Sequence, residues 1–230
     1  YTDVDGVYNA DPRIVPNARK MEEVTYDEML EMASLGAKVL HSRCVEIAKK
    51  YGVELLVCSS LNRNSGTMVR EKTKMEKMLI SGVAADKNVA KIRVAGLGND
   101  PESTFRLLNL LDRNNLNIDV MIQSLGKDGT KSVSFTVAKP DMLRTIDVLN
   151  DNKDSLGIKK LDYDENVAKI SVIGAGVRSH SGVAAKMFGA LANAGINTEM
   201  ITTSEIRITA LIDEAYADQA MRAIHETFLE

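Results

Sequence analysis

The chain carries the stretch Asp86-Lys-Asn-Val-Ala-Lys-Ile-Arg-Val-Ala-Gly-Leu-Gly98, which returns 78 residues later as Asp164-Glu-Asn-Val-Ala-Lys-Ile-Ser-Val-Ile-Gly-Ala-Gly176. Farther on, Leu116-Asn-Ile-Asp119 has its counterpart in Ile196-Asn-Thr-Glu199, at an offset of 80 residues. An equivalence kept over so long a stretch indicates that one supersecondary unit has been duplicated. This duplicated unit decides the fold.

Each copy predicts the element order β-α-β-β-α. A short apolar run that ends in glycines predicts a buried strand at residues 90–97 and again at 168–175. A hairpin and a second helix close each copy, at 118–125, 132–138 and 141–152 and then at 198–204, 207–212 and 214–228. The first helix of each copy is predicted to bury a helical stripe of apolar residues, namely Phe105, Leu108 and Leu111 with Leu107 beside them, and Val183, Met187 and Leu191 with Phe188 beside them.

Each copy lacks one strand of the ferredoxin-like β-α-β-β-α-β sandwich. Residues 158–163 can supply that strand to the first copy, but the second copy ends with the chain at Glu230. The only unused strand is Met78–Ala84, so we expect it to cross over and complete the C-terminal copy. The predicted fold class is therefore α+β, with two ferredoxin-like βαββαβ modules, one inserted in the other.

Residues 1–67 differ in kind from the repeats. They predict an opening strand and turn over residues 1–8, a helix from Tyr26 to Tyr51 and a strand at 53–59, too little to form a core alone. The mixed-charge run Arg70–Lys77 predicts a solvated linker. The expected division is 1–67, a linker at 68–77, a discontinuous module of 78–85 with 166–230, and an inserted module of 86–165.

The composition is that of a globular protein, with 44% hydrophobic and 27% charged residues among 230. With 29 basic and 32 acidic residues, the chain offers no positive field for nucleic acid. The two cysteines, Cys44 and Cys58, form neither a disulfide framework nor a zinc pattern, and no apolar run is long enough for a membrane. We expect a cytoplasmic protein that binds neither nucleic acid nor membrane. Because residue 1 is tyrosine, we also expect it to be the end of a longer protein.

The stretch from Thr2 to Arg13 packs three carboxylates, a glycine and an arginine between a strand and a loop. Such a loop suits a nucleotide, since Thr2 and backbone amides can donate hydrogen bonds, Tyr8 can cover a base and Arg13 can pair with a phosphate. An ordinary acidic turn has the same composition. The residues alone leave both interpretations open.

This stretch, with Ile14-Val-Pro-Asn-Ala-Arg-Lys20, Tyr26-Asp-Glu-Met29 and Leu35-Gly-Ala-Lys-Val-Leu-His41, closely resembles the end of the catalytic domain of aspartokinases. The resemblance continues through Ser59-Ser60 and Gly66-Thr67 into two repeats that look like the paired ACT modules of that family. It implies an α/β remnant of an amino-acid-kinase domain before the modules. It also implies transfer of phosphate from ATP to the side-chain carboxylate of aspartate, the first step toward lysine, threonine and methionine.

The resemblance implies that ATP, with Mg in the parent enzyme, is the cofactor and that this chain holds none tightly. Lys38 is expected near phosphate, although a helix-surface lysine is its plain alternative. The phosphate loop and the aspartate-binding residues of the family lie upstream of Tyr1, so the catalytic set is incomplete, no metal ligand is assigned and the chain alone is expected to be inactive. The implied ATP contacts are Thr2, Asp3, Tyr8, Asp11, Pro12, Arg13, Lys38 and Val39.

The family's ACT modules bind end products that inhibit the enzyme, here expected to be lysine, threonine or both. In each module, the amides at the start of the first helix can hold a carboxylate, and oxygens at the strand ends can accept from an ammonium. Polar residues at strand ends are the plain alternative. The expected effector contacts are Asn99, Asp100, Asn117, Asp119, Gln123, Ser181, Val183, Asn197, Glu199, Ile201, Thr202 and Ser204.

The first effector loop departs from the family pattern Asp-x-Pro-Gly, because it is Asn99-Asp-Pro-Glu102 here. We expect a homo-oligomer that assembles through the ACT modules, with a catalytic subunit as a further partner. The alternative function is a non-catalytic ACT-type regulatory subunit or amino-acid-binding module.

Overall fold

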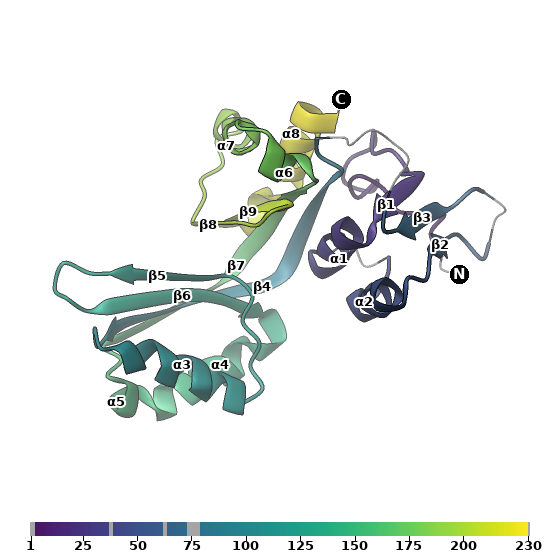
Figure 1. Ribbon diagram of the computed structural model, residues 1–230. Helices are drawn as coiled ribbons and strands as arrows, with labels where there is room; N and C mark the ends of the chain where they lie inside the picture. Colours follow the sequence, from purple (N-terminus) through teal and green to yellow (C-terminus); the bar gives the residue numbers. More distant parts are fainter. Residues whose placement is uncertain (1–2, 37–38, 62–63, 73–78, 230) are drawn as a thin grey trace. The chain divides into compact units, whose positions relative to one another are not determined.

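The computed structural model describes residues 3–36, 39–61, 64–72 and 79–229 (Figure 1). The chain forms two compact units, Tyr1–Lys87 with Lys169–Glu230, and Asn88–Ala168. We call residues 3–72 the N-terminal segment, 88–168 the first module, and 79–87 with 169–229 the second module. Within the described residues, no helix combines the length and the hydrophobicity that crossing a membrane requires.

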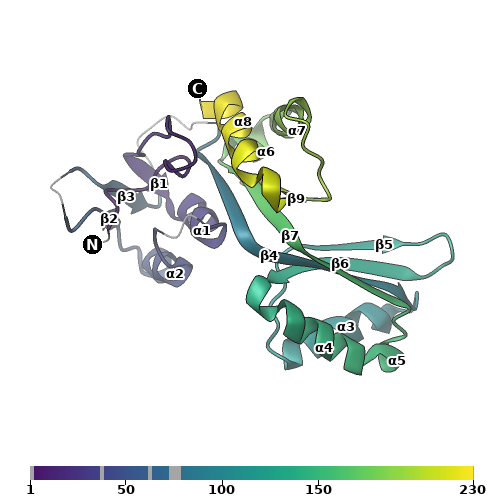
Figure 2. The same ribbon diagram turned by 180° about the vertical axis from the view of Figure 1, so that it is seen from behind.

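The first module is a four-stranded antiparallel sheet in the order β5-β6-β4-β7. Figures 1 and 2 show α3 and α4 on the same face of this sheet. Leu107 and Leu111 of the predicted stripe are buried in the core of this module, as is Phe135. Leu108 is half-buried, and Phe105 is 65% exposed, so the prediction was wrong for Phe105. Its elements are β4 (Gly82–Leu97), α3 (Pro101–Arg113), β5 (Met121–Leu125), β6 (Lys131–Ala138), the 3-10 turn η1 (Lys139–Asp141), α4 (Met142–Asp151), α5 (Lys153–Leu156) and β7 (Lys160–Ile173).

The second module repeats this arrangement with the order β4-β7-β9-β8. Helices α7 and α8 pack against each other (Figure 2), and Val183, Met187 and Leu191 are buried as predicted. Its remaining elements are α6 (Gly176–Ser179), α7 (Val183–Asn193), β8 (Met200–Thr203), β9 (Arg207–Asp213), the 3-10 turn η2 (Glu214–Tyr216) and α8 (Ala217–Leu229).

The predicted crossover is confirmed, because the chain before the first module completes the second one. The Ser81 amide donates to the Ile173 carbonyl at 2.7 Å, and the Gly176 amide donates to the Leu79 carbonyl at 2.9 Å. The strand begins at Gly82 and runs unbroken to Leu97, and Met78 lies outside the described residues. Likewise, the strands predicted at 158–163 and 168–175 are one strand, β7. Each long strand thus serves one module with its first half and the other with its second.

The N-terminal segment forms a small sheet in the order β1-β3-β2. Its core of Val24, Met29, Val45 and other buried apolar residues also contains Ala84 and Ile173, which belong to the second module. The segment therefore buries its apolar surface with help from that module, as its short length demands. Its elements are β1 (Glu23–Thr25), α1 (Tyr26–Ser34), α2 (Ser42–Tyr51), β2 (Leu55–Val57) and β3 (Thr67–Arg70).

The single helix predicted from Tyr26 to Tyr51 is in fact two helices. Gly36 has a φ of 101°, a left-handed conformation that ends α1 and favours glycine. His41 then caps α2, because its Nδ1 accepts from the Arg43 amide at 3.2 Å. Periodicity alone could not find this break, since the apolar spacing of the two helices runs on through it.

Two further expectations for the N-terminal segment were wrong. The described part of the opening stretch is irregular, and its one strand-like contact is the bridge between Tyr8 and Lys20. Residues 68–70, expected to open the linker, belong to β3, which pairs with β1 and β2. Thr67 and Val69 are both buried, and this alternation is the pattern of a β-strand. The charged residues that follow favoured the prediction of a linker instead.

Gly174→Ala should destabilise the protein by about 1–3 kcal/mol, the usual cost of overpacking. A Cβ at Gly174 would lie 2.7 Å from the Ile80 Cα and 2.8 Å from the Ser81 nitrogen, both of them backbone atoms of the crossing segment. Urea unfolding measures the loss.

The matched control is Gly189→Ala in α7, where a Cβ has no neighbour within 4 Å. This change should stabilise the helix by about 0.5–1 kcal/mol. An equal urea midpoint for Gly174→Ala and the parent protein would contradict the crossing geometry.

Candidate nucleotide and effector sites

Three of the expected nucleotide contacts, Asp11, Pro12 and Arg13, lie on a loop whose two ends are hydrogen-bonded together. The Asn9 amide donates to the Arg19 carbonyl at 3.0 Å, and the Met21 amide donates to the Val7 carbonyl at 2.8 Å. At the tip, the Asp11 carbonyl accepts from the amides of Ile14 and Val15. We call residues 9–20 the nucleotide loop. Because hydrogen bonds close the base of the loop, the backbone that carries the tip is held in one conformation.

The tip carries a charged pair at the surface. Arg13 donates to Asp11 from Nη2 at 2.6 Å and from Nε at 3.0 Å. These hydrogen bonds hold the pKa of the Asp11 carboxyl below its usual value. The Arg13 side chain is 88% exposed, so a phosphate can reach the guanidinium in competition with Asp11. Pro12 lies exposed between them.

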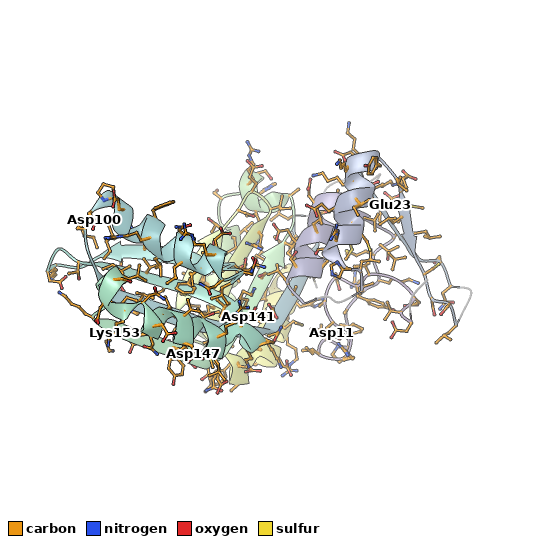
Figure 3. All side chains as sticks on the ribbon, turned by 90° about the horizontal axis from the view of Figure 1, so that it is seen from below. Asp11, Glu23, Asp100, Asp141, Asp147 and Lys153 are labelled. Carbon is orange, nitrogen blue, oxygen red and sulfur yellow. The ribbon has the colours of Figure 1, made fainter. Side chains whose placement is uncertain are left out.

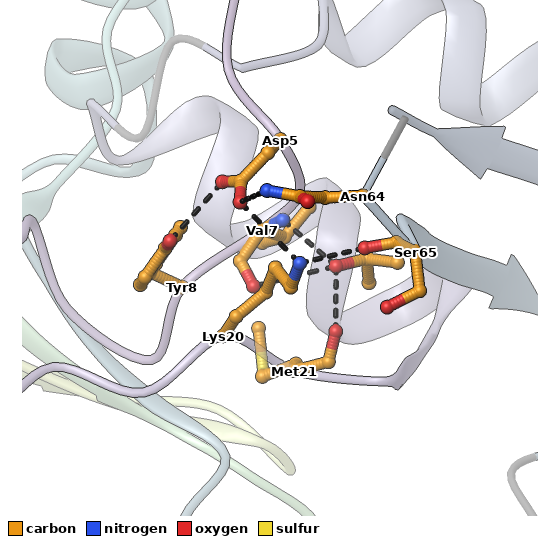
Figure 4. A network of polar contacts seen from close by, with 8 residues as sticks. Asp5, Val7, Tyr8, Lys20, Met21, Asn64 and Ser65 are labelled. Atoms are coloured by element: carbon orange, nitrogen blue, oxygen red, sulfur yellow. Dashed lines mark hydrogen bonds and ion pairs between the residues drawn. The ribbon is translucent and has the colours of Figure 1, made fainter. Parts of the chain in front are cut away.

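The Asp5 carboxylate organises the residues beside this loop (Figure 4). It accepts from the Tyr8 hydroxyl at 3.1 Å and from Lys20 Nζ at 3.4 Å. Burial raises the pKa of Asp5, but the hydrogen bonds from Tyr8, Lys20 and Asn64 outweigh burial and hold it below its usual value. Burial and the hydrogen bond to Asp5 raise the pKa of Tyr8. The Tyr8 ring is thus anchored by its hydroxyl.

A second set of hydrogen bonds fixes the same region. The Thr67 hydroxyl accepts from the Val7 amide at 2.8 Å and donates to the Met21 carbonyl at 2.6 Å, while Lys20 Nζ donates to the Ser65 carbonyl at 2.6 Å (Figure 4). The sequence did not indicate these supporting residues, because they come from three separate parts of the chain.

The other expected ATP contacts fall in different places. Asp3 is exposed, and Val39 packs partly buried against the core of the N-terminal segment. Thr2 and Lys38 lie outside the described residues.

In the first module, Asp100 binds the start of its own helix (Figure 3). Its Oδ1 accepts from the amides of Glu102 at 3.0 Å and Ser103 at 2.8 Å, and its Oδ2 accepts from the Ser103 hydroxyl. Pro101 occupies the first turn, where no amide is needed. The carboxylate of Asp100 thus occupies the amides at which we expected the carboxylate of an effector.

Gln123 is the residue that the structure brings to this helix, because its Oε1 accepts from the Thr104 hydroxyl at 2.6 Å. The other expected contacts of the first module are exposed, and they flank the same two elements: Asn99 before α3, and Asn117 and Asp119 before β5.

In the second module, the N-cap residue of α7 is Gly182, which has a φ of 106°. No side chain among the described residues caps this helix. Ser181 is exposed beside it, whereas Val183 is only 2% exposed and serves the core. The two modules therefore differ at the position where an anion would bind.

The remaining expected effector contacts of the second module lie on its hairpin or at the entry to it. Ile201 is 45% exposed on β8, and Thr202 lies opposite Thr209. The Ser204 amide donates to the Arg207 carbonyl at 2.7 Å, which closes the hairpin. Asn197 and Glu199 are exposed at its entry.

Arg207 forms its ion pair outside its own hairpin. Its Nη1 donates to Glu31 Oε2 on α1 at 2.8 Å, and both side chains are largely buried. Glu205 pairs with Arg178, at 3.0 Å on the surface. An ion pair thus joins the hairpin of the second module to the N-terminal segment. The sequence could not reveal it, because the two residues are far apart in the chain.

Comparison with known proteins supports both the kinase-domain remnant in the N-terminal segment and the ACT fold of the second module. The amino acid kinase family matches residues 1–59, and the ACT domain matches residues 170–228. The fold and the sites therefore define a protein in which ACT modules follow the end of an amino-acid-kinase domain.

The aspartokinase of Pseudomonas aeruginosa is 43% identical over 231 residues, which cover 99% of this chain and 56% of that protein. A solved structure of aspartokinase alpha and beta subunits is 42% identical with a TM-score of 0.61, and the match covers 65% of this chain and 98% of that one. The chain belongs to the aspartokinase family. It spans about half the length of the curated relatives that it matches.

Aspartokinase III of E. coli, solved with aspartate and ADP, is similar over the whole chain. It is 27% identical with a TM-score of 0.88, and the match covers 100% of this chain and 52% of that one. The same enzyme solved with lysine and aspartate gives a TM-score of 0.82 at 27% identity, covering 100% of this chain and 51% of that one.

Asp100→Ala should lower the melting temperature at pH 7, because the amides of α3 lose their acceptor. The Ser103 hydroxyl and the backbone amides hold the pKa of Asp100 below its usual 3.8. A carboxyl with a lowered pKa stabilises the fold above its unfolded pKa and loses this effect as the pH falls through the folded pKa. The difference between variant and parent should therefore disappear in melts below that folded pKa.

Asp100→Asn is the matched control, since asparagine caps helices about as well as aspartate. Its melting temperature at pH 7 should stay near that of the parent, without the acid-dependent loss. Identical melting temperatures for Asp100→Ala and the parent at pH 7 would show that the cap contributes nothing.

Proposed function

We propose that this chain is the C-terminal, regulatory portion of an aspartokinase that transfers phosphate from ATP to the side-chain carboxylate of aspartate. Its ACT modules would sense lysine, threonine or both. The observation that carries the proposal is the Glu31–Arg207 ion pair, which joins the expected effector hairpin to the helix that precedes Lys38. Ala84 and Ile173 of the second module also lie in the core of the N-terminal segment, and this shared packing supports the proposal.

For ATP, the nucleotide loop offers positioning and charge. Phosphoryl transfer asks the protein mainly to orient the phosphates and to neutralise the charge that develops on them. Arg13 and Lys38 would supply positive charge, and Tyr8, anchored by Asp5, would contact the base. The described residues contain no group of three His, Cys, Asp or Glu side chains that could hold a metal ion. Mg²⁺ would accompany the phosphates of ATP in the parent enzyme.

For the effector, the second module provides the better carboxylate site. The amides at the start of α7 have no side-chain cap among the described residues, whereas Asp100 already occupies those of α3. Oxygens of Glu199, Thr202 and Ser204 would accept from the ammonium. Lysine is the favoured effector, because an E. coli relative has been solved with it.

The alternative function is a non-catalytic regulatory subunit. The match to the aspartokinase alpha and beta subunits favours it, because 65% of this chain accounts for 98% of that one. On this alternative, the chain would bind lysine and would regulate a separate catalytic polypeptide.

Aspartate-dependent release of ADP from ATP should be seen with the full-length protein and should be absent with residues 1–230 alone. The physical reason is that the phosphate loop and the aspartate-binding residues of the family lie outside this chain. A coupled ADP assay makes the measurement, and calorimetry with lysine and with threonine on the 230-residue chain tests the sensing role.

Turnover by the 230-residue chain at an ordinary enzyme rate, about 1–1,000 per second, would contradict the division of roles. Lysine and threonine both failing to bind would contradict the sensing role.

Arg207→Met in the full-length protein should weaken inhibition by lysine at saturation while the protein still binds lysine. An effector can shift activity only through contacts that differ between the two states, and this ion pair is the contact that joins the hairpin to α1. Activity measured against lysine concentration tests it.

Arg178→Met is the matched control, because Arg178 also pairs with a glutamate near this hairpin but lies on the surface. Inhibition of this variant should equal that of the parent. Equal inhibition of the Arg207→Met variant would exclude the ion pair from the regulatory path.

A further inference from the structure

Asn9, at the base of the nucleotide loop, is buried, and its backbone amide, its carbonyl and its side-chain Oδ1 all form hydrogen bonds. Only 6% of the residue is exposed. Its Oδ1 accepts from the Arg19 amide at 2.8 Å, which joins the two ends of the loop, and its carbonyl accepts from the Val83 amide of β4 at 2.8 Å. Gly82 permits this approach, since a Cβ there would lie 3.0 Å from the Asn9 carbonyl oxygen. The base of the loop is therefore fixed to the second module through Asn9.

His225 on α8 makes the other contact of Asn9. Only 1% of this histidine is exposed, and its Nε2 lies 3.3 Å from Asn9 Oδ1. Because the Arg19 amide donates to that Oδ1, the atom is the carbonyl oxygen of the side chain, and His225 Nε2 must carry the proton and donate. One turn earlier on α8, Arg222 Nη1 donates to the Ile14 carbonyl at 3.5 Å. The last helix of the second module thus touches both the base and the tip of the loop.

We propose that His225 is a positioning residue for the nucleotide loop: it holds Asn9, and through Asn9 the loop, in the conformation that binds ATP. The proposal rests on the proposed function, because it takes ATP as the ligand of the loop. Its chemistry is that of preorganisation, since a loop that is already closed loses less freedom when the nucleotide binds. The sensing module would then support the affinity for nucleotide directly, through a path separate from the effector hairpin.

The first test is His225→Leu in the full-length protein, with steady-state kinetics in ATP and in aspartate. Losing one buried hydrogen bond and the order that it imposes should raise the KM for ATP about tenfold. The kcat at saturating ATP and the KM for aspartate should stay within about twofold. A purely structural role would instead lower kcat and the melting temperature without singling out ATP.

His225→Gln should restore the KM for ATP, because the glutamine amide places an N–H near the position of Nε2. His225→Asn should not, because its amide is too short to reach Asn9. If the leucine variant fails to fold, comparing the glutamine and asparagine variants still tests the proposal. Thr227→Ala, on the exposed face of the same helix, should match the parent in every parameter.

Asn9→Leu should raise the KM for ATP by a similar factor, and the double variant with His225→Leu should add little, as expected for two residues in one contact. Equal KM values for ATP in the glutamine, asparagine and parent proteins would overturn the proposal. If the full-length parent protein shows no aspartate-dependent consumption of ATP, the proposed function is overturned instead. The two failures are therefore distinguishable.

Discussion

The structure depends on the placement of the segment that leads into β4. Residues 79–87 complete the sheet of the second module by lying beside β7, where the Ser81 amide donates to the Ile173 carbonyl at 2.7 Å. An open sheet edge would be the alternative, and it carries unpaired backbone groups. Gly174 and Gly176 admit this segment, because a Cβ on either would collide with its backbone.

The same segment supports the N-terminal segment. Ala84 enters its apolar core, and the Val83 amide binds the carbonyl of Asn9 at the base of the nucleotide loop. One stretch of backbone therefore completes the sensing fold and fixes the loop expected to bind nucleotide. The sheet of the second module and the base of this loop are therefore in direct backbone contact.

The duplication made most of the fold predictable, because a repeated apolar pattern fixes its strands, helices and missing strand at once. The places where prediction failed are those that depend on contacts between distant residues. The break after α1 follows from a glycine that lies against the second module, and the partner of Arg207 is Glu31, 176 residues away. At the candidate sites, the ATP and effector residues came from the family resemblance, whereas their supports, Asp5 and Thr67 among them, are visible only in three dimensions.

The two modules descend from one unit, yet they have diverged at the first turn of the first helix. Asp100 supplies a carboxylate to the amides of α3, and Gly182 leaves those of α7 without a side-chain cap among the described residues. A helix that binds its own carboxylate gains stability and loses the attraction for an outside anion, because the same amides cannot serve both. In the first module, Asp100 thus caps its own helix, and Gln123 accepts a hydrogen bond from Thr104 of the same helix. The second module leaves the first amides of α7 without such a cap among the described residues, and its hairpin and last helix both contact the N-terminal segment.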